Sequence, residues 1–283
     1  MKPVVTFIAI SYALVWLLSM SVWHTGLSRS FARILFPMAM FIPTIAVLAT
    51  AAIFRERNLG KSMGLRLGRG RWWTYWLFSW IAFPVFCLSA PFVGAAFRIY
   101  PLDIKEFSGF RELIAASGGA PRQIAIERLV AMQLGAIPFG PILNAPFAFG
   151  EEFGWRGYLL PRLLGLGERP ALVLSGVIWG LWHTPLVLLG HNYPNDPVRG
   201  VICMIVFCTL MGFILGWTRL ASDSIWPAVI GHGALNGSAG AVLLFARAGT
   251  RLDPTQVGIT GWSGWLVPAS VACVLAFAYR GRG

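Results

Sequence analysis

Residues 200–219 read GVICMIVFCTLMGFILGWTR, and the arginine at the end is the only charged residue among them. A helix needs roughly 20 predominantly apolar residues to span a bilayer, so this stretch predicts a membrane-spanning helix. Seven more apolar stretches of similar length lie at about 4–23, 31–54, 72–97, 140–162, 171–190, 224–246 and 260–279. The sequence therefore predicts an all-α, polytopic membrane bundle of about eight transmembrane helices.

Two of these stretches need a further argument. The limits of the fourth are blurred by Pro138, Pro141 and Pro146, and we expect these prolines to loosen the first turns of a helix at 140–162. The first stretch is too long for the apolar region of a signal peptide and lacks a small-residue cleavage site after it. We therefore expect it to be retained.

The composition excludes a soluble fold. Only 12% of the 283 residues are charged, whereas soluble domains carry about a quarter. The absence of low-complexity tracts and the presence of only four cysteines also argue against a disordered chain or a disulfide scaffold. The net charge of +12 is better explained by loops that face anionic lipid than by a nucleic-acid partner, because basic residues also orient membrane spans.

The basic residues predict the orientation of the chain. The loop Arg55–Arg71 holds six basic residues against one acid, Glu56, whereas the loop Arg98–Gln123 on the other side is more balanced. This bias predicts that both termini are cytoplasmic. No linker divides the chain, so we expect a single integral membrane domain over residues 1–283, multi-pass in a bacterial cytoplasmic membrane.

A few polar residues interrupt the apolar helices. Ionisable groups inside a bilayer are costly, so each one is a candidate functional residue. Glu151 and Glu152 lie in the fourth predicted helix, His183 in the fifth, and His232 with Asn236 in the seventh. At a rise of about 1.5 Å per residue, these side chains lie roughly 14 to 20 Å from the inner ends of their helices. Three helices therefore bring their polar groups to one level.

The spacing of these residues also predicts which way they face. His232 and Asn236 are four residues apart and share a helix face, and so do Glu152 and Arg156. Glu151 points about 100° away, so one carboxylate can pair with Arg156 while the other faces elsewhere. Pairs of glycines with GxxxG spacing on the same helices and on the sixth predict close approach, at Gly150/Gly154, Gly176/Gly180, Gly212/Gly216 and Gly233/Gly237.

Each feature also has a purely structural explanation. A buried pair such as Glu152–Arg156 is more often structural than functional, and a lone membrane histidine is as often a packing group as a working one. We expect His24 and His191, at span ends, to have no functional role. Core packing is the expected role of Trp155, Trp179, Trp182 and of the cysteines Cys87, Cys203, Cys208 and Cys273. The occurrence of the polar set at one depth favours a functional site.

The polar set resembles the signature of the CPBP family, the CAAX prenyl endopeptidase and bacteriocin-processing type of intramembrane protease. The likeness covers about residues 140–240 and rests on Glu151-Glu152-x-x-x-Arg156, on an aromatic residue four positions before His183, and on His232-x-x-x-Asn236. Trp179 stands where the family usually has Phe, and we expect this change to alter packing rather than chemistry.

The resemblance implies a glutamate-dependent hydrolysis of peptide bonds without a cofactor, with residues 140–240 as the catalytic core. On that pattern Glu151 and His183 would activate a water, and His232 and Asn236 would form the oxyanion hole. Glu152 and Arg156 would hold the helix and the first carboxylate in position. The expected partners are the bilayer and a membrane-embedded or lipid-modified substrate, either a CAAX-type carboxyl terminus or a peptide or protein leader.

Other functions use the same residues. Glu151, His183 and His232 could bind zinc in a membrane metalloprotease, although the chain has no HExxH motif. A non-catalytic immunity or scaffold protein would have no need of these polar groups at one level. Transport is less favoured because the sequence has no evident inverted repeat.

Overall fold

The computed structural model describes residues 1–25, 35–57, 59–118 and 124–278. These residues form no sheet, and their strand-like pairing is limited to one isolated bridge between Leu102 and Ala246. The all-α prediction is confirmed. The α-helices are α1 Lys2–Thr25, α3 Ile42–Phe54, α4 Leu59–Ser62, α5 Trp72–Ala96, α6 Ser108–Ala116, α7 Ile126–Ala136, α8 Gly140–Glu152, α9 Leu160–Leu163, α10 Glu168–Trp182, α11 Thr184–Leu188, α12 Pro197–Ser222, α13 Trp226–Ser238 and α14 Leu266–Ala278.

Six helical segments within the described residues are long and apolar enough to cross a bilayer, at Lys2–Thr25, Leu35–Phe54, Trp72–Ala96, Ile126–Leu166, Glu168–Leu188 and Pro197–Ser222. They correspond to the first six predicted spans, and the chain is an integral multi-pass membrane protein. The predicted count of eight is not confirmed, because α13 and α14 have only 13 residues each. The chain leaves α13 through a 3₁₀ segment, η4 (Ala239–Leu243), and enters α14 through another, η5 (Trp262–Trp265).

The fourth segment is longer than predicted. It is helical from Ile126, not from about 140, and it continues to Leu166. Pro138 is accommodated in a 3₁₀ turn, η1 (Ile137–Phe139), and Pro141 lies in the first turn of α8, where the missing N–H has no partner to lose. The prolines therefore change the local geometry of the segment without ending it.

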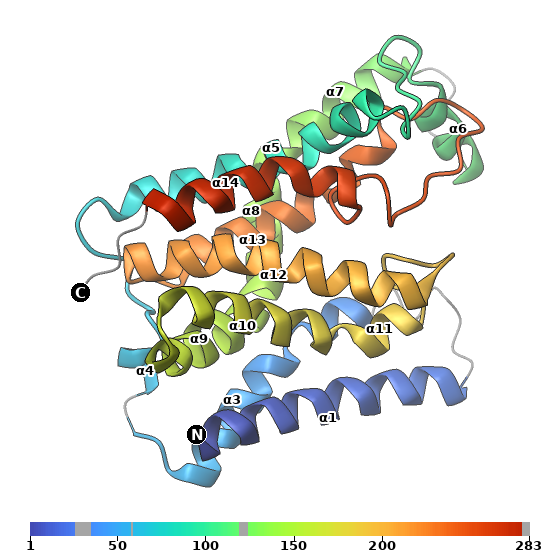
Figure 1. Cartoon of the computed structure of the whole chain (residues 1–283). Coiled ribbons are helices and arrows are strands. Elements are labelled where there is room, and N and C mark those ends of the chain that lie inside the picture. Colours follow the sequence, from blue (N-terminus) through green and yellow to red (C-terminus); the bar gives the residue numbers. More distant parts are fainter. Residues whose placement is uncertain (26–34, 58, 119–123, 279–283) are drawn as a thin grey trace.

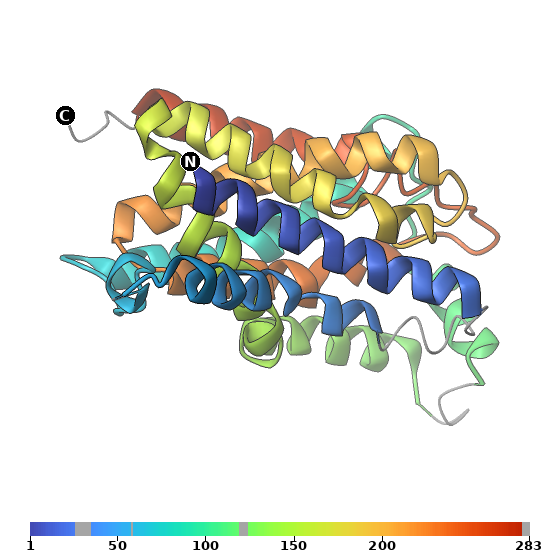
Figure 2. The same ribbon diagram turned by 90° about the horizontal axis from the view of Figure 1, so that it is seen from below.

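The helices pack around α12 and α13, which lie at the centre of the bundle (Figure 1). Helix α10 packs along α12, whereas α8 and α5 both pack against α13, and α1 packs against α3. Figure 1 and Figure 2 show that α1 begins and α14 ends at the same end of the bundle. The loop after α4 is joined to the α12–α13 turn at this end by ion pairs from Arg66 and Arg69 to Asp223.

The glycine pairs lie where helices approach most closely. A Cβ atom added at Gly176 would lie 2.6 Å from the Cα atom of Thr209, and one at Gly180 would lie 2.6 Å from that of Ile205. A Cβ atom at Gly237 would lie 2.6 Å from the Cα atom of Gly140. These contacts join α10 to α12 and α13 to α8, so the close approach predicted from the GxxxG spacing is confirmed.

Replacing Gly176 by valine should lower the free energy of unfolding by about 1–3 kcal/mol or more, because the added atoms meet the backbone of α12 rather than a movable side chain. The midpoint of thermal unfolding in detergent measures the effect. Gly135→Ala is the matched control, since no atom lies within 4 Å of a Cβ added there. Equal midpoints for Gly176→Val and the wild type would contradict the packing argument.

Candidate active site

A cavity of about 410 Å³ lies among α8, α10, α12 and α13. Four of the six predicted site residues line it: Glu151, His183, His232 and Asn236. The other two, Glu152 and Arg156, are fully buried next to it. His191 and Asn192, in the connection between α11 and α12, also line the cavity. Figure 1 shows this connection at the end of the bundle away from the N-terminus. The polar groups predicted to share one depth on three helices therefore do meet.

Glu151 is held by two tryptophans. The indole N–H groups of Trp179 and Trp155 both donate to its Oε2 atom, at 2.6 and 3.1 Å. Trp155 lies one turn along the same helical segment, whereas Trp179 comes from α10. Both indole groups donate to Oε2, and Oε1 accepts no hydrogen bond from any of the described residues. The carboxylate thus has a fixed oxygen and a second oxygen available to the cavity that Glu151 lines.

Glu152 is the centre of a buried ionic network. Its Oε1 atom accepts hydrogen bonds from Nη1 of Arg156 and from Nδ1 of His232, each at 2.8 Å. The predicted pairing of Glu152 with Arg156 across one turn is confirmed. Arg156 also lies over the ring of Trp179, with its guanidinium carbon 4.3 Å from the ring centroid. Glu152 therefore links α8 to α13, and Arg156 links it to α10.

The helix changes its winding directly after the two glutamates. Residues Phe153–Leu159 (η2) form a π-helical segment, and this wider turn carries Trp155 and Arg156. Gly154 within it packs against Pro43 of α3, where a Cβ atom would lie 3.2 Å from the side chain of Phe7. π-Helical turns within α-helices are frequent at functional sites.

His183 lies at the junction of α10 and α11. Pro185, two residues later, cannot donate a backbone N–H, and the helical hydrogen bonding of α10 stops at Trp182. The Nδ1 atom of His183 lies 2.9 Å from the carbonyl oxygen of Trp179. A carbonyl only accepts, so Nδ1 carries the proton and the lone pair of Nε2 remains free.

Helix α13 contributes the remaining two residues. His232 is 4% exposed and is oriented by its bond to Glu152, whereas the side chain of Asn236 is exposed to the cavity. The amide of Asn236 has no hydrogen-bond partner in the described part of the chain. It presents both a donor and an acceptor to whatever enters the cavity.

Sequence reasoning missed several residues of this site. Trp179 lies in the core as expected, at 2% exposed, but its N–H group also donates to Glu151, which the sequence did not predict. His191 was expected to have no functional role, yet it lines the cavity and packs edge-on against Phe36. Burial lowers the pKa of His191 to about 4, so it is neutral at pH 7. The cavity is also lined by Asn144, Asn192, Cys208 and Thr260.

The described residues do not bring three His, Cys, Asp or Glu side chains together in an arrangement that could hold a metal ion. Nδ1 of His232 is occupied by Glu152, and Oε2 of Glu151 is occupied by two indole N–H groups. Within the described residues, the zinc alternative would therefore have to use the remaining atoms, Oε1 of Glu151 and Nε2 of His183 and His232.

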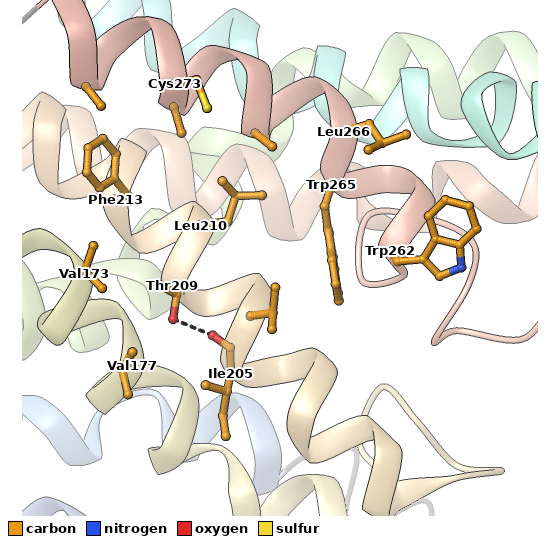
Figure 3. Close-up of a pocket in the computed structure, with 14 residues that line it drawn as sticks. Val173, Val177, Ile205, Thr209, Leu210, Phe213, Trp262, Trp265, Leu266 and Cys273 are labelled. Carbon is orange, nitrogen blue, oxygen red and sulfur yellow. Dashed lines mark hydrogen bonds between the residues drawn. The ribbon is translucent and has the colours of Figure 1, made fainter.

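A second and larger cavity, of about 810 Å³, lies on another face of α12 (Figure 3). It is a groove between α10, α12, η5 and α14, with Val173, Phe213 and Trp265 among its apolar walls. The hydroxyl of Thr209 in this groove donates to the carbonyl of Ile205, one turn away on the same helix (Figure 3). None of the predicted site residues lines this groove.

Residues 130–238 match the family model described as Type II CAAX prenyl endopeptidase Rce1-like. The matched segment contains all six predicted site residues and the helices α8, α10, α12 and α13 that carry the cavity. This match agrees with the resemblance of the same residues to the CPBP family. Trp179 lies in the matched segment and supplies a hydrogen-bond donor to the site.

A curated protein is similar to a shorter part of the chain. The chain is 33% identical over 92 residues to a protein named CAAX prenyl protease 2 from Methanococcus maripaludis. The similarity covers 30% of this chain and 34% of the relative, so the chain spans about a third of the length of the curated relative it matches.

Proposed function

We propose that this chain is an intramembrane endopeptidase in which Glu151 activates a water for the hydrolysis of a peptide bond. The observation that carries the proposal is the state of Glu151. One of its oxygens is fixed by two indole N–H groups, and the other is left for the cavity, which also holds the free Nε2 atom of His183. A carboxylate and a neutral imidazole can together orient a water and accept its proton.

The proposed reaction needs only residues of this chain. The Nε2 atom of His183 accepts a hydrogen bond from the water, and Oε1 of Glu151 takes a proton as the water oxygen attacks the carbonyl carbon. The resulting tetrahedral oxyanion collapses with cleavage of the C–N bond. The proton held by Glu151 passes to the leaving nitrogen, so the products are a new carboxyl and a new amino terminus.

The oxyanion is stabilised by donors on α13. Asn236 can donate from its amide nitrogen, and His232 can donate from Nε2 while its Nδ1–H group donates to Oε1 of Glu152. In this scheme His232 carries a proton on each ring nitrogen. A single oxyanion donor contributes about 10²–10³-fold to the rate.

The proposed substrate is a membrane-associated peptide or protein, with a CAAX-type carboxyl terminus or a leader segment at the cleaved bond. The family description and the printed name of the Methanococcus relative support the first of these. The cavity wall supports an apolar segment near the cleaved bond, since Phe36, Met40, Phe147 and Phe207 contribute to it. We place the enzyme in a bacterial cytoplasmic membrane, with both termini cytoplasmic.

Comparative mass spectrometry of peptides from membranes tests this function. Membranes that contain the wild type should yield at least one product that is missing with Glu151→Ala at equal abundance of the protein. Identical peptide profiles would reject the protease and favour a scaffold. The residues flanking the cleaved bond would identify the substrate and distinguish a CAAX terminus from a leader.

Chelation should leave the cleavage rate unchanged within about twofold, because the proposed base is a carboxylate that needs no Lewis acid. The measurement is the rate before and after incubation with 1,10-phenanthroline, together with metal analysis of the purified protein. Loss of activity that is restored by added zinc would establish the metalloprotease alternative with Glu151, His183 and His232 as ligands.

A further inference from the structure

Trp179 contacts four of the six predicted site residues. Its indole N–H donates to Glu151 at 2.6 Å, and its backbone carbonyl accepts from Nδ1 of His183 at 2.9 Å. Its ring lies under the guanidinium of Arg156, with 4.3 Å between the guanidinium carbon and the ring centroid. The edge of the same ring system meets the imidazole of His232, with 5.3 Å between centroids.

We propose that Trp179 is a positioning residue that orients the Glu151 carboxylate through its indole N–H and so sets the direction in which the free oxygen accepts a proton. This inference rests on the proposed role of Glu151. The phenylalanine usual at this position has no donor, so this device depends on tryptophan here. Trp179 does not touch the water or the substrate in this scheme and acts through Glu151.

The hydrogen bond is well suited to this task. A donor to an ionised carboxylate makes a shorter and roughly twice stronger hydrogen bond than a neutral pair. Trp179 is 2% exposed, so no water competes for the indole proton. With Oε2 fixed by Trp179 and supported by Trp155, rotation of the carboxylate is restricted and Oε1 keeps one direction.

Arg156 strengthens the same donor. A cation over an indole face is attracted to the electron-rich ring and draws electron density towards itself. The electron-poor ring is a better N–H donor to Glu151. The ion pair Glu152–Arg156 therefore acts on Glu151 through Trp179, although Arg156 makes no hydrogen bond to Glu151 among the described residues.

Kinetics of Trp179→Phe in full-length protein, reconstituted in liposomes, test the proposal. The probe is an internally quenched, farnesylated CAAX-type peptide. We expect kcat to fall about 10- to 100-fold, as for the loss of a hydrogen bond to a charged group, with KM unchanged. Trp155→Phe should have a smaller effect, because its bond is longer at 3.1 Å. A change in KM alone would overturn the proposal.

A further variant separates the effect of the N–H group of Trp179 from that of its ring, and a second serves as a control. Benzothienylalanine at position 179 keeps the shape of indole but replaces N–H by sulfur, and it should reproduce the low kcat of Trp179→Phe. Full rescue by this residue would show that Trp179 acts by packing alone. Trp80→Phe is the matched control, since it removes an indole bond to the carbonyl of Pro138 outside the cavity.

Infrared spectroscopy tests the hydrogen bond from Trp179 to Glu151 without any substrate. With isotope-labelled glutamate, the difference between wild type and Glu151→Gln identifies the carboxylate bands of Glu151. These bands should shift in Trp179→Phe and stay in place in Trp80→Phe, and unshifted bands in Trp179→Phe would overturn the proposal. If the wild type leaves the farnesylated peptide intact, the proposed substrate fails while the infrared result still decides the role of Trp179.

Discussion

Glu151→Gln should lower the cleavage rate by at least about 10²–10⁴-fold, the contribution of a positioned general base, while the protein stays folded. Glutamine keeps the volume of glutamate and still offers an oxygen to the indole N–H groups of Trp155 and Trp179. It cannot take a proton from water. The rate therefore changes for a chemical reason and not because the site collapses.

The measurement is the initial rate of the purified variant on a product identified by mass spectrometry, alongside its midpoint of thermal unfolding. Glu127→Gln is the matched control, because Glu127 is exposed in the first turn of α7. It should retain the wild-type rate. A Glu151→Gln rate within threefold of the wild type would place the base on another residue, with His183→Ala as the next variant to measure.

Glu152→Ala should lower the free energy of unfolding by about 3–5 kcal/mol, because it leaves buried charge without a partner. The side chains of Glu152 and Arg156 are 0% and 1% exposed, so water cannot replace the lost carboxylate. The same substitution frees Nδ1 of His232. Both stability and activity should therefore fall.

A double variant distinguishes lost charge pairing from lost packing. Glu152→Gln with Arg156→Met removes both charged groups at similar volume. It should recover at least half of the stability lost in Arg156→Met alone, which leaves the buried carboxyl of Glu152 without its guanidinium partner. Unfolding in mixed micelles of SDS and a mild detergent measures all the variants. Additive losses in the double variant would show that Glu152 and Arg156 contribute independently.

The sequence alone was sufficient to predict the features that depend on a single helix. The rise per residue is nearly constant, so counting residues placed Glu151, His183 and His232 at one depth. The four-residue spacing was sufficient to pair Glu152 with Arg156, since that distance fixes the relative direction of two side chains on a helix. The glycine pairs indicated close approach because a missing Cβ permits it.

Features that depend on the rotation of one helix against another could not be predicted. The bond from His232 to Glu152 and the bond from Trp179 to Glu151 each join two helices. Their formation depends on helix rotation and on side-chain rotamers, which spacing within one helix does not determine. His191 follows the same rule, because only the folding of its loop against Phe36 brings it to the cavity.

The predicted boundaries of the fourth helix were wrong for a different reason. The prediction has Pro138, Pro141 and Pro146 loosen the start of a helix at about 140. Pro138 lies in a 3₁₀ turn, Pro141 in the first turn of α8 and Pro146 inside α8, and the helical segment runs through all three from Ile126. Nothing in the composition of Phe153–Leu159 distinguishes a π-helical turn from an α-helical one.

The absence of side chains at Gly176 and Gly180 has a consequence for protein engineering. Because α10 rests directly on the backbone of α12, the height of His183 above the cavity is set by main-chain contact rather than by adjustable side chains. A graft of the six polar residues onto another helical scaffold would not reproduce the site unless the scaffold also had this interhelical spacing. A graft must therefore reproduce the separation of the helix backbones as well as the six polar side chains.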